Sequence, residues 1–226
     1  MKHKFILFYS FVLLLFISAC SNQQAEYSSV LEIIDKDYRL SSENLSAFCK
    51  ENKIDVNSIY KWESHWLIYA QFQNVEKLKT RLEKKFPSIE IKIYDKPFYN
   101  FNRKKKCNEK PVEKWDNIIM TANLVEDTTL QNEYIEYHRT QFEKWPEISK
   151  GFCNANFQQL LVFRNGRQLM LVISIPKGES LDKLNPKTTE NNPRVNEWNA
   201  LMSKYQEGIE DAPKGTTWVM FEKMTP

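Results

Sequence analysis

The first half of the chain switches between two hydrophobic periods. Apolar residues form short β-prone runs at 30–34 and 89–93, whereas after Ser41 and Val75 they recur at helical spacing. Two aromatic and β-branched runs lie between the helices and surround a short turn, a pattern typical of a hairpin. The predicted elements are a strand at 30–34, a helix that begins at 41–43, strands at 59–62 and 66–72, a helix at 75–86 and a strand at 89–93.

The second half repeats this order of elements. Apolar residues from Leu130 to Trp145 fall at spacings of three, four and seven, which marks one face of a helix that Pro146 ends or kinks. We expect Asn165-Gly166 to supply the positive φ angles of a tight hairpin and Gly208 to cap a helix. The predicted elements are a strand at 118–125, a helix at 130–145, strands at 157–163 and 168–175, a helix at 193–206 and a strand at 216–222.

Two β-α-β-β-α-β units predict an α+β fold with two ferredoxin-like sheets. Each unit leaves one sheet face uncovered, and pairing the two faces in an α/β barrel would bury both. We therefore expect a ferredoxin-like domain at residues 29–101, a linker at 102–115 and a second domain at 116–226. In this arrangement the chain is its own pseudo-dimer, so we expect a monomer.

The N-terminus has the pattern of an export signal. Two lysines precede an apolar run from Phe5 to Ile17, and small residues follow it. The run is shorter than the about 20 apolar residues that a spanning helix needs. The ending Ile17-Ser18-Ala19-Cys20 resembles the lipobox of bacterial lipoproteins, in which the cysteine is acylated and becomes the new N-terminus.

This resemblance implies a signal peptide at residues 1–19, a lipidated Cys20 and a tether at residues 20–28. The protein would then be a lipoprotein anchored in the membrane of a bacterial cell envelope, facing the periplasm or the surface. An ordinary signal peptide with a cut nearby is the alternative.

Composition excludes several classes of function. The five glycines all follow residue 150 and are scattered, so the chain has no Rossmann or Walker A phosphate loop. Loss of residues 1–19 removes two lysines and no acidic residue, which lowers the net charge from +3 to +1. Because phosphate binding needs a concentrated basic face, we expect no nucleic-acid partner.

The cysteines and histidines suggest no metal site. Cys49, Cys107 and Cys153 remain after export; two of them could pair, but they have no zinc-ligand spacing. We expect His65 in an exposed hairpin turn. His138 instead shares a helical face with Tyr134, four residues earlier, beside Tyr137 and before Trp145.

An imidazole with a pKa near 6.5 exchanges protons at neutral pH, and tyrosine and tryptophan side chains bind sugars. Helical aromatic stripes are also typical of a hydrophobic core, so a buried structural histidine is the alternative.

The ordered motifs of the second half resemble the L-rhamnose mutarotase family. The resemblance covers residues 116–224 and rests on Glu133–His138, Trp145–Ile148, the hairpin at 160–175 and Glu197–Met202. It implies an isomerase that interconverts sugar anomers, with a monosaccharide substrate such as L-rhamnose or L-fucose and with no metal or cofactor.

The same resemblance implies the roles of individual residues. His138 would be the proton donor, Tyr134 a hydrogen-bond partner of the sugar and Trp198 part of the stacking wall, with Tyr137 and Trp145 also at the site. In the family the histidine lies four residues before the tryptophan of Trp-Pro-Glu, whereas His138 lies seven before Trp145. Aligning on Trp-Pro-Glu instead would place Gln141 at the histidine position, and an amide cannot transfer a proton.

Two other functions remain open at this point. The first is a non-catalytic carbohydrate-binding lipoprotein, which would keep the sugar pocket but would not accelerate the interconversion of anomers. The second is another α+β barrel activity, such as a cofactor-independent oxygenase, which is favoured by fold analogy alone.

Overall fold

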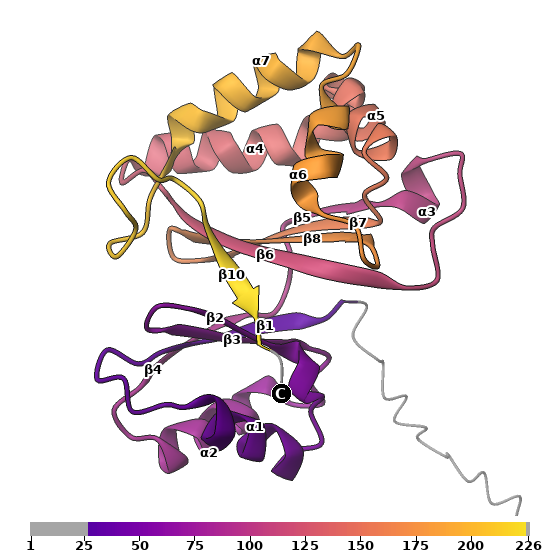
Figure 1. Cartoon of the computed structure of the whole chain (residues 1–226). Helices are drawn as coiled ribbons and strands as arrows, with labels where there is room; N and C mark the ends of the chain where they lie inside the picture. The colour runs from indigo at the N-terminus through magenta and orange to yellow at the C-terminus, as the bar shows by residue number, and fades with distance from the viewer. Residues whose placement is uncertain (1–26, 225–226) are drawn as a thin grey trace, which may run out of the picture.

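A computed structural model of the chain describes residues 27–224, so the predicted signal peptide and Cys20 lie outside the described residues (Figure 1). The first half has the predicted β-α-β-β-α-β order, in a sheet with strand order β4-β1-β3-β2. Its elements are β1 (Ser29–Ile34), α1 (Ser42–Glu51), η1 (Val56–Ser58), β2 (Ile59–Trp62), β3 (His65–Ala70), α2 (Val75–Lys85) and β4 (Glu90–Tyr94).

The second half has the same arrangement with additions. Its strands follow the order β10-β6-β8-β7, β5 extends the sheet beyond β7, and β9 pairs with β6. Its elements are β5 (Tyr99–Asn102), α3 (Arg103–Lys106), β6 (Trp115–Leu124), α4 (Thr128–Lys144), α5 (Pro146–Asn154), β7 (Gln159–Asn165), β8 (Gln168–Pro176), α6 (Leu181–Leu184), η2 (Asn185–Thr188), α7 (Pro193–Met202), η3 (Ser203–Tyr205), β9 (Gln206–Glu207) and β10 (Val219–Lys223).

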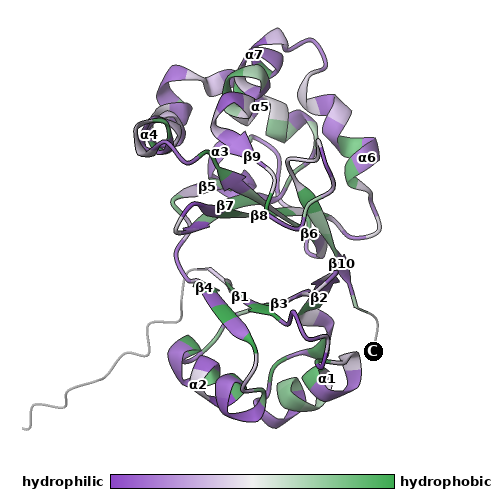
Figure 2. Ribbon diagram, turned by 90° about the vertical axis from the view of Figure 1, so that its left-hand side faces the viewer, coloured by the Kyte–Doolittle hydropathy of each residue, from purple (hydrophilic) through white to green (hydrophobic). Residues whose placement is uncertain are grey.

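One curled antiparallel sheet runs through both halves. The start of β10 pairs with β6, where Phe221 lies opposite Ile119, and its end pairs with β2, where Glu222 lies opposite Lys61. Figure 2 shows the two parts of the sheet facing each other, with α1 and α2 on one outer side and α4, α5 and α7 on the other. The fold is therefore a mixed α/β fold of four layers, in the order helices, sheet, sheet, helices.

Three hydrophobic clusters fill the spaces between neighbouring layers. One lies under α1 and α2 and is mostly aliphatic, and another lies under α4, α5 and α7. The third lies between the facing parts of the sheet and draws residues from both halves. Its buried members are Val30, Tyr60, Leu67, Tyr94, Ile119, Leu161, Phe163, Met170, Val172 and Phe221.

The four predicted helices begin within two residues of their predicted starts, and α3, α5 and α6 were not predicted. Ser41 accepts a hydrogen bond from the backbone of Asn44, and the Asn44 side chain accepts one from the backbone of Ser41, which forms a capping box at α1. The helix predicted at 130–145 is α4, and Pro146 occupies the first turn of α5, where a missing backbone N–H costs no hydrogen bond. No helix within residues 27–224 is both long and apolar enough to span a bilayer.

The segment predicted as a linker, residues 102–115, is more structured than expected. It contains α3, and Cys107 forms a disulfide with Cys153 on α5. The strand before it, β5, lies within the range predicted for the first domain but pairs with β7 of the second half. Both pairings join residues far apart in the sequence.

Three local predictions are wrong. Of the hairpin residues, Gly166 has a positive φ of 59°, whereas Asn165 ends β7 in strand conformation. Gly208 caps no helix, because α7 ends at Met202 and Gly208 follows β9. His65 begins β3 and is buried, not exposed in a turn.

Candidate active site

The helix α4 carries the residues that the sequence singled out. Its N-cap Asp127 accepts hydrogen bonds from the backbone of Thr129 and Leu130 at 2.7 and 3.3 Å. Tyr134 and His138 are one turn apart and both are buried against the sheet. This face of α4 therefore places a phenol and an imidazole next to each other, at 4.3 Å between ring centroids.

Aromatic rings surround His138. Besides Tyr134, the rings of Tyr99, Trp198 and Phe98 lie with their centroids 5.2, 5.3 and 5.7 Å from that of the imidazole. These residues come from α4, α7 and the segment around β5, so the site is formed only when the helices pack on the sheet.

The surroundings of His138 fix its protonation. Burial among these rings disfavours the charged imidazolium and lowers the pKa of His138 to about 4, although a hydrogen bond to a backbone carbonyl opposes this effect. That bond joins Nδ1 to the carbonyl oxygen of Tyr134 at 2.9 Å. Because a carbonyl only accepts, Nδ1 carries the proton and Nε2 carries the lone pair. At neutral pH His138 is a neutral imidazole and a proton acceptor at Nε2.

The hydroxyl of Tyr134 is held by a second chain of hydrogen bonds. Gln206 Nε2 donates to this hydroxyl at 3.1 Å, and Gln206 Oε1 accepts from Trp218 Nε1 at 3.1 Å. Burial raises the pKa of Tyr134 above its usual value, so the hydroxyl stays protonated. Since its oxygen already accepts from Gln206, its proton can be donated to another acceptor.

The structure shows what Gln141, the alternative to His138, does. Gln141 is fully buried, its Oε1 accepts from the Tyr99 hydroxyl at 2.7 Å, and its Nε2 donates to the carbonyl oxygen of Trp145 at 2.6 Å. Both ends of the amide are therefore used to hold β5 and the end of α4 together. Gln141 positions Tyr99, which in turn contacts His138.

Three aromatic residues extend the site away from the sheet. The Trp198 ring lies 5.5 Å from that of Trp145 and 6.4 Å from that of Tyr137. The guanidinium of Arg194 lies 3.8 Å above the Trp145 ring, in cation–π geometry. Trp145 and Tyr137 are half-buried and Trp198 is buried, so these residues form a wall with a partly accessible edge.

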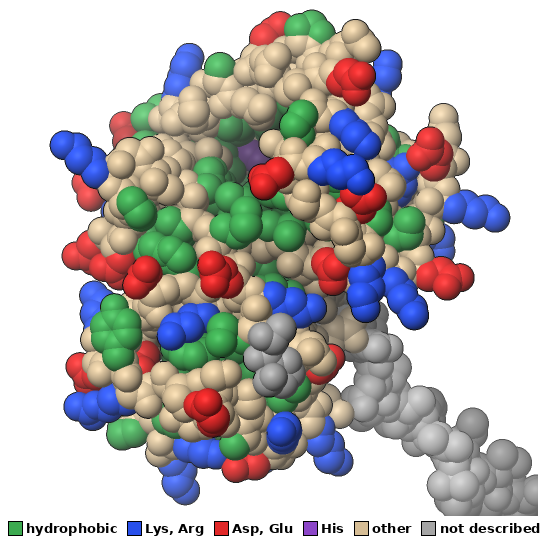
Figure 3. Space-filling model, in the orientation of Figure 1, with side chains coloured by type: hydrophobic (Ala, Val, Ile, Leu, Met, Phe, Trp, Pro, Cys, Tyr) green, Lys and Arg blue, Asp and Glu red, His purple; other side chains and the backbone are tan. Residues whose placement is uncertain are grey.

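Figure 3 shows a hollow beside α4, in the upper half of the molecule, with hydrophobic walls and a histidine at its floor. His138 is the histidine of this half of the described chain. Within residues 27–224, no three His, Cys, Asp or Glu side chains come together in a way that could hold a metal ion. The groups gathered at this site are thus aromatic rings, hydroxyls and one imidazole.

Comparisons with known proteins agree on this half of the chain. Residues 117–224 match the model of the L-rhamnose mutarotase family. An L-fucose mutarotase from Xanthomonas campestris pv. campestris is 29% identical over 102 residues, which are 45% of this chain and 79% of that protein. A UPF0734 protein from Dictyostelium discoideum is 31% identical over 93 residues, which are 41% of this chain and 71% of that protein.

The similarity to the L-rhamnose mutarotase family thus lies in the second half of the chain. The matched range begins in β6 and ends after β10, so it includes α4 and α7, which carry Tyr134, His138 and Trp198. The matched range leaves out β5 and therefore Tyr99, whose ring packs against the His138 imidazole.

Similar solved structures cover more of the chain at lower similarity. A ferredoxin-fold protein of Listeria monocytogenes, described as related to antibiotic biosynthesis monooxygenases, has a TM-score of 0.43 at 12% identity and covers 89% of this chain and 97% of its own. A heme-degrading enzyme of the same organism has a TM-score of 0.40 at 12% identity and covers 87% of this chain and 99% of its own.

Sequence reasoning missed several residues that border the candidate site. Tyr99 and Phe98 lay in the range predicted for the other domain, and Gln206 lay in a predicted helix rather than in β9. The alternation of the aromatic Tyr99 and Phe101 with Asn100 and Asn102 was the available signal for β5 in the sequence.

Proposed function

We propose that the mutarotase-family half interconverts the anomers of a reducing deoxyhexose such as L-rhamnose or L-fucose. Support comes from the family match over residues 117–224 and from the relative named as an L-fucose mutarotase. The observation that carries the proposal is the single tautomer of His138, whose Nε2 lone pair lies in an aromatic site.

His138 serves as base first and acid second. With a pKa of about 4, only about one molecule in a thousand carries the imidazolium at pH 7, so the resting site cannot rely on it as a proton donor. Nε2 takes the proton of the anomeric hydroxyl while the bond between the anomeric carbon and the ring oxygen breaks. The resulting imidazolium is a strong acid and returns a proton to the ring oxygen, which yields the open aldehyde.

The remaining steps reverse this chemistry after a rotation. The carbonyl of the open sugar turns to present its other face, and the sugar hydroxyl attacks it while His138 again accepts one proton and returns one. The Tyr134 hydroxyl, oriented by Gln206, donates a hydrogen bond to an oxygen of the sugar. No atom enters or leaves the sugar in the complete cycle.

The aromatic wall binds the apolar face of the sugar. Trp198 borders both His138 and Trp145, so a ring stacked on Trp198 would place its anomeric carbon near the imidazole. Tyr137 would offer its hydroxyl at the accessible edge. A 6-deoxy sugar has a methyl group where other hexoses have a hydroxymethyl group, which suits an apolar wall.

We further propose that the first half takes the place of a partner subunit in an intrachain α/β barrel. The two β-α-β-β-α-β sheets share β10 and a core drawn from both halves, which supports this interpretation. The chain would then be a monomer, and sedimentation of the purified protein tests this. A stable dimer would contradict it.

The export proposal rests on the predicted signal and on the disulfide. Disulfides persist in oxidising compartments and are rare in the cytosol, so Cys107–Cys153 supports an envelope location. We expect the protein to partition into detergent after expression in a bacterium and Cys20→Ser to abolish this. Equal partitioning of the variant would contradict lipidation.

Anomeric exchange provides the decisive test of activity. Saturation of one anomeric proton signal of L-rhamnose or L-fucose should transfer to the other anomer at a rate that rises with protein concentration. We expect His138→Ala to lose at least about a hundredfold of this rate, because proton transfer by a positioned group contributes that much. A binder without activity would show line broadening but no accelerated exchange.

His65→Gln is the matched control, since it removes the histidine of the other half. It should keep the exchange rate within about twofold per folded molecule, as judged by circular dichroism. If His138→Ala exchanges anomers as fast as the unmodified protein, the site assignment is wrong.

A further inference from the structure

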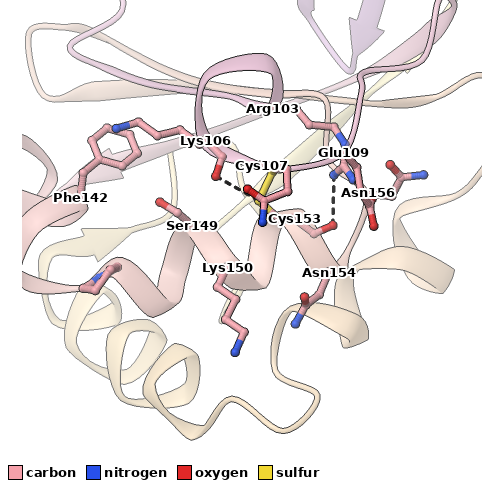
Figure 4. Close-up of a pocket in the computed structure, with 12 residues that line it drawn as sticks. Arg103, Lys106, Cys107, Glu109, Phe142, Ser149, Lys150, Cys153, Asn154 and Asn156 are labelled. Atoms are coloured by element: carbon pink, nitrogen blue, oxygen red, sulfur yellow. Dashed lines mark hydrogen bonds and ion pairs between the residues drawn. A yellow bond between two sulfur atoms is a disulfide. The ribbon is translucent and has the colours of Figure 1, made fainter.

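A second cleft lies on the mutarotase-family half, away from His138. It has a volume of about 690 Å³ and runs between α5 and the segment that begins with α3 (Figure 4). This volume is within the range of small-molecule sites. The residues that matter for its chemistry are Arg103, Lys106, Asn108, Phe142, Ser149 and Lys150.

A disulfide holds the two walls of this cleft together. Cys107, just after α3, is bonded to Cys153 on α5, and both residues line the cleft. Arg103 adds a second link, since its Nη1 donates to the carbonyl oxygen of Cys153 at 3.0 Å. The cleft is therefore preformed, which lowers the entropic cost of binding a ligand.

Two polar atoms at the cleft lack partners. Arg103 is 1% exposed, and its Nη2 pairs with Glu109, but its Nε has no hydrogen-bond partner within the described residues. The Ser149 hydroxyl oxygen is likewise buried and unpartnered there. Because buried polar groups nearly always have partners, these two atoms indicate a polar ligand or solvent in the cleft.

The charges at the cleft favour an anion. Arg103, Lys106 and Lys150 line it with only Glu109 to oppose them, which leaves an excess of two positive charges. Lys106 Nζ lies 3.7 Å above the Phe142 ring, so the ammonium group covers an aromatic face inside the cleft. Figure 4 shows Lys106 lying along Phe142 and Lys150 extending from α5 away from it, so both side chains must turn to contact an anion in the cleft.

The neutral lining adds groups that suit hydroxyls. Asn108, Asn154 and Asn156 contribute amides, which both donate and accept hydrogen bonds, and Ser149 contributes its hydroxyl. Phe142 offers an apolar surface of the kind on which sugar rings stack once Lys106 turns toward an anion.

We propose that this cleft binds a monosaccharide that carries a carboxylate or a phosphate. The anionic group lies between Lys106 and Lys150, the hydroxyls bond to Ser149 and the amides, and the apolar face of the ring covers Phe142. The cleft is separate from the proposed mutarotase site, because the Tyr99 ring stands between Phe142 and His138, at 5.4 and 5.2 Å from them.

Nuclear magnetic resonance titration of the intact, oxidised protein tests this. The probes are D-glucuronate, D-glucose 6-phosphate, D-glucose and inorganic phosphate. We expect saturable shifts of backbone signals in residues 103–109 and 149–156 with one or both anionic sugars, and at least about tenfold weaker binding of glucose and of phosphate. Glucose as strong as the anionic sugars, or phosphate as strong as either, would overturn the proposal.

Variants make the assignment specific. Lys106→Ala combined with Lys150→Ala should weaken binding of the anionic sugar about tenfold, since two charge contacts are lost. Lys50→Ala combined with Lys84→Ala removes the same charge from exposed positions on α1 and α2 and should leave the affinity unchanged. If both double variants weaken binding equally, net charge alone explains the loss of affinity, and this would contradict the site.

Ser149→Ala tests the contact with the sugar ring separately from the contacts with the anionic group. It should weaken the anionic sugar about threefold and leave the weak binding of inorganic phosphate unchanged, because the hydroxyl meets the ring and not the anion. Its thermal unfolding midpoint should not fall, since the removed hydroxyl had no partner to lose. Unchanged sugar binding in this variant would contradict the proposed pose. Anomeric exchange on L-rhamnose is measured in parallel, so failure of either proposal is visible without the other.

Discussion

The two halves share one order of strands and helices but differ on the sheet face that the helices cover. In the first half this face is mostly aliphatic, with Leu31, Ile33 and Leu45 in the core. In the second half it carries tyrosines and tryptophans around one imidazole, including Tyr134 and Trp198. The two halves therefore differ not in topology but in the side chains on one face of their helices, which in the second half are those of α4 and α7.

Each half also buries one histidine, and the two histidines contact different kinds of groups. Burial among aromatic rings keeps His138 neutral, although its Nδ1 donates to a backbone carbonyl. His65 Nδ1 lies 2.9 Å from Glu32 Oε1, and its Nε2 lies 3.4 Å from Asp211 of the other half. A carboxylate partner makes His65 part of a polar link between the halves.

Glu32 is the centre of that link. It is fully buried, and Tyr94 and Gln168 donate to it at 2.8 and 3.2 Å. Gln168 also donates to Thr121 at 3.0 Å, which connects β1 to β6 and β8. One carboxylate thus bonds to residues of both sheets.

The largest difference between the halves should come from the disulfide. Cys107–Cys153 closes a loop of 46 residues, and loops of this size contribute about 4 kcal/mol to the free energy of unfolding. Urea unfolding with and without a reductant measures this in the unmodified protein. In the double variant Cys107→Ala with Cys153→Ala, the reductant should not change the free energy of unfolding.

Cys49 is the control thiol of the first half. Burial raises its pKa to about 12, so it stays protonated and unreactive. Cys49→Ala should respond to reductant as the unmodified protein does. A reductant effect that disappears in Cys49→Ala would contradict the assigned pairing.

Removal of the central carboxylate should have the next largest effect. We expect Glu32→Ala to lower the free energy of unfolding by about 3 to 4 kcal/mol, because it leaves three buried donors unpaired. Glu32→Gln keeps an acceptor and should lose about half as much. Both values come from urea unfolding at pH 7, and a loss below about 1 kcal/mol in Glu32→Ala would show that the link is unimportant.

Acid should destabilise the second half through His138. The folded pKa of about 4 lies below the value of 6.5 expected in the unfolded chain, so the unfolded state binds the proton first as the pH falls. Stability is complete above about pH 6.5 and decreases toward pH 4, by about 3 kcal/mol in total. His138→Leu lacks this proton, so its loss between pH 6.5 and 4 should be smaller by that amount.

His65→Gln, measured over the same pH range, gives the comparison with the other half. If His138→Leu and the unmodified protein lose equal stability over this range, the imidazole is not held neutral by burial.

The smallest effects should come from the helix caps. Asp127→Ala at α4 and Ser41→Ala at α1 should each cost about 1 kcal/mol of unfolding free energy. Only Asp127→Ala should also slow anomeric exchange, because α4 carries His138. An equal effect of both caps on exchange would show that the two halves act as one catalytic unit.

Local patterns predicted most of the fold. The periods around Leu45, Leu78 and Tyr134 identified the helices α1, α2 and α4, and the element order predicted the β-α-β-β-α-β order of each half. It did not predict that β10 joins the strands of both halves in one sheet. The helical spacing of Tyr134 and His138 also placed them on one buried face, as the structure shows. These features depend on neighbours within about four residues.

Pairings between distant residues were not predictable in this way. The strand β5 has only four residues and gains its partner from β7, about 60 residues later. The buried state of His65 depends on Glu32, 33 residues earlier, and on Asp211. Cysteine spacing alone left the partner of Cys107 open. Such contacts follow from the assembled sheet, not from local propensity.

The shared strand β10 has a consequence for how the protein is made. It lies at Val219–Lys223, far along the sequence from both β2 and β6, and it pairs with the free edge of each of these strands. During synthesis these two strand edges stay unpaired until β10 has left the ribosome. An open edge attracts other strands, so the growing chain is exposed to aggregation until β10 is added.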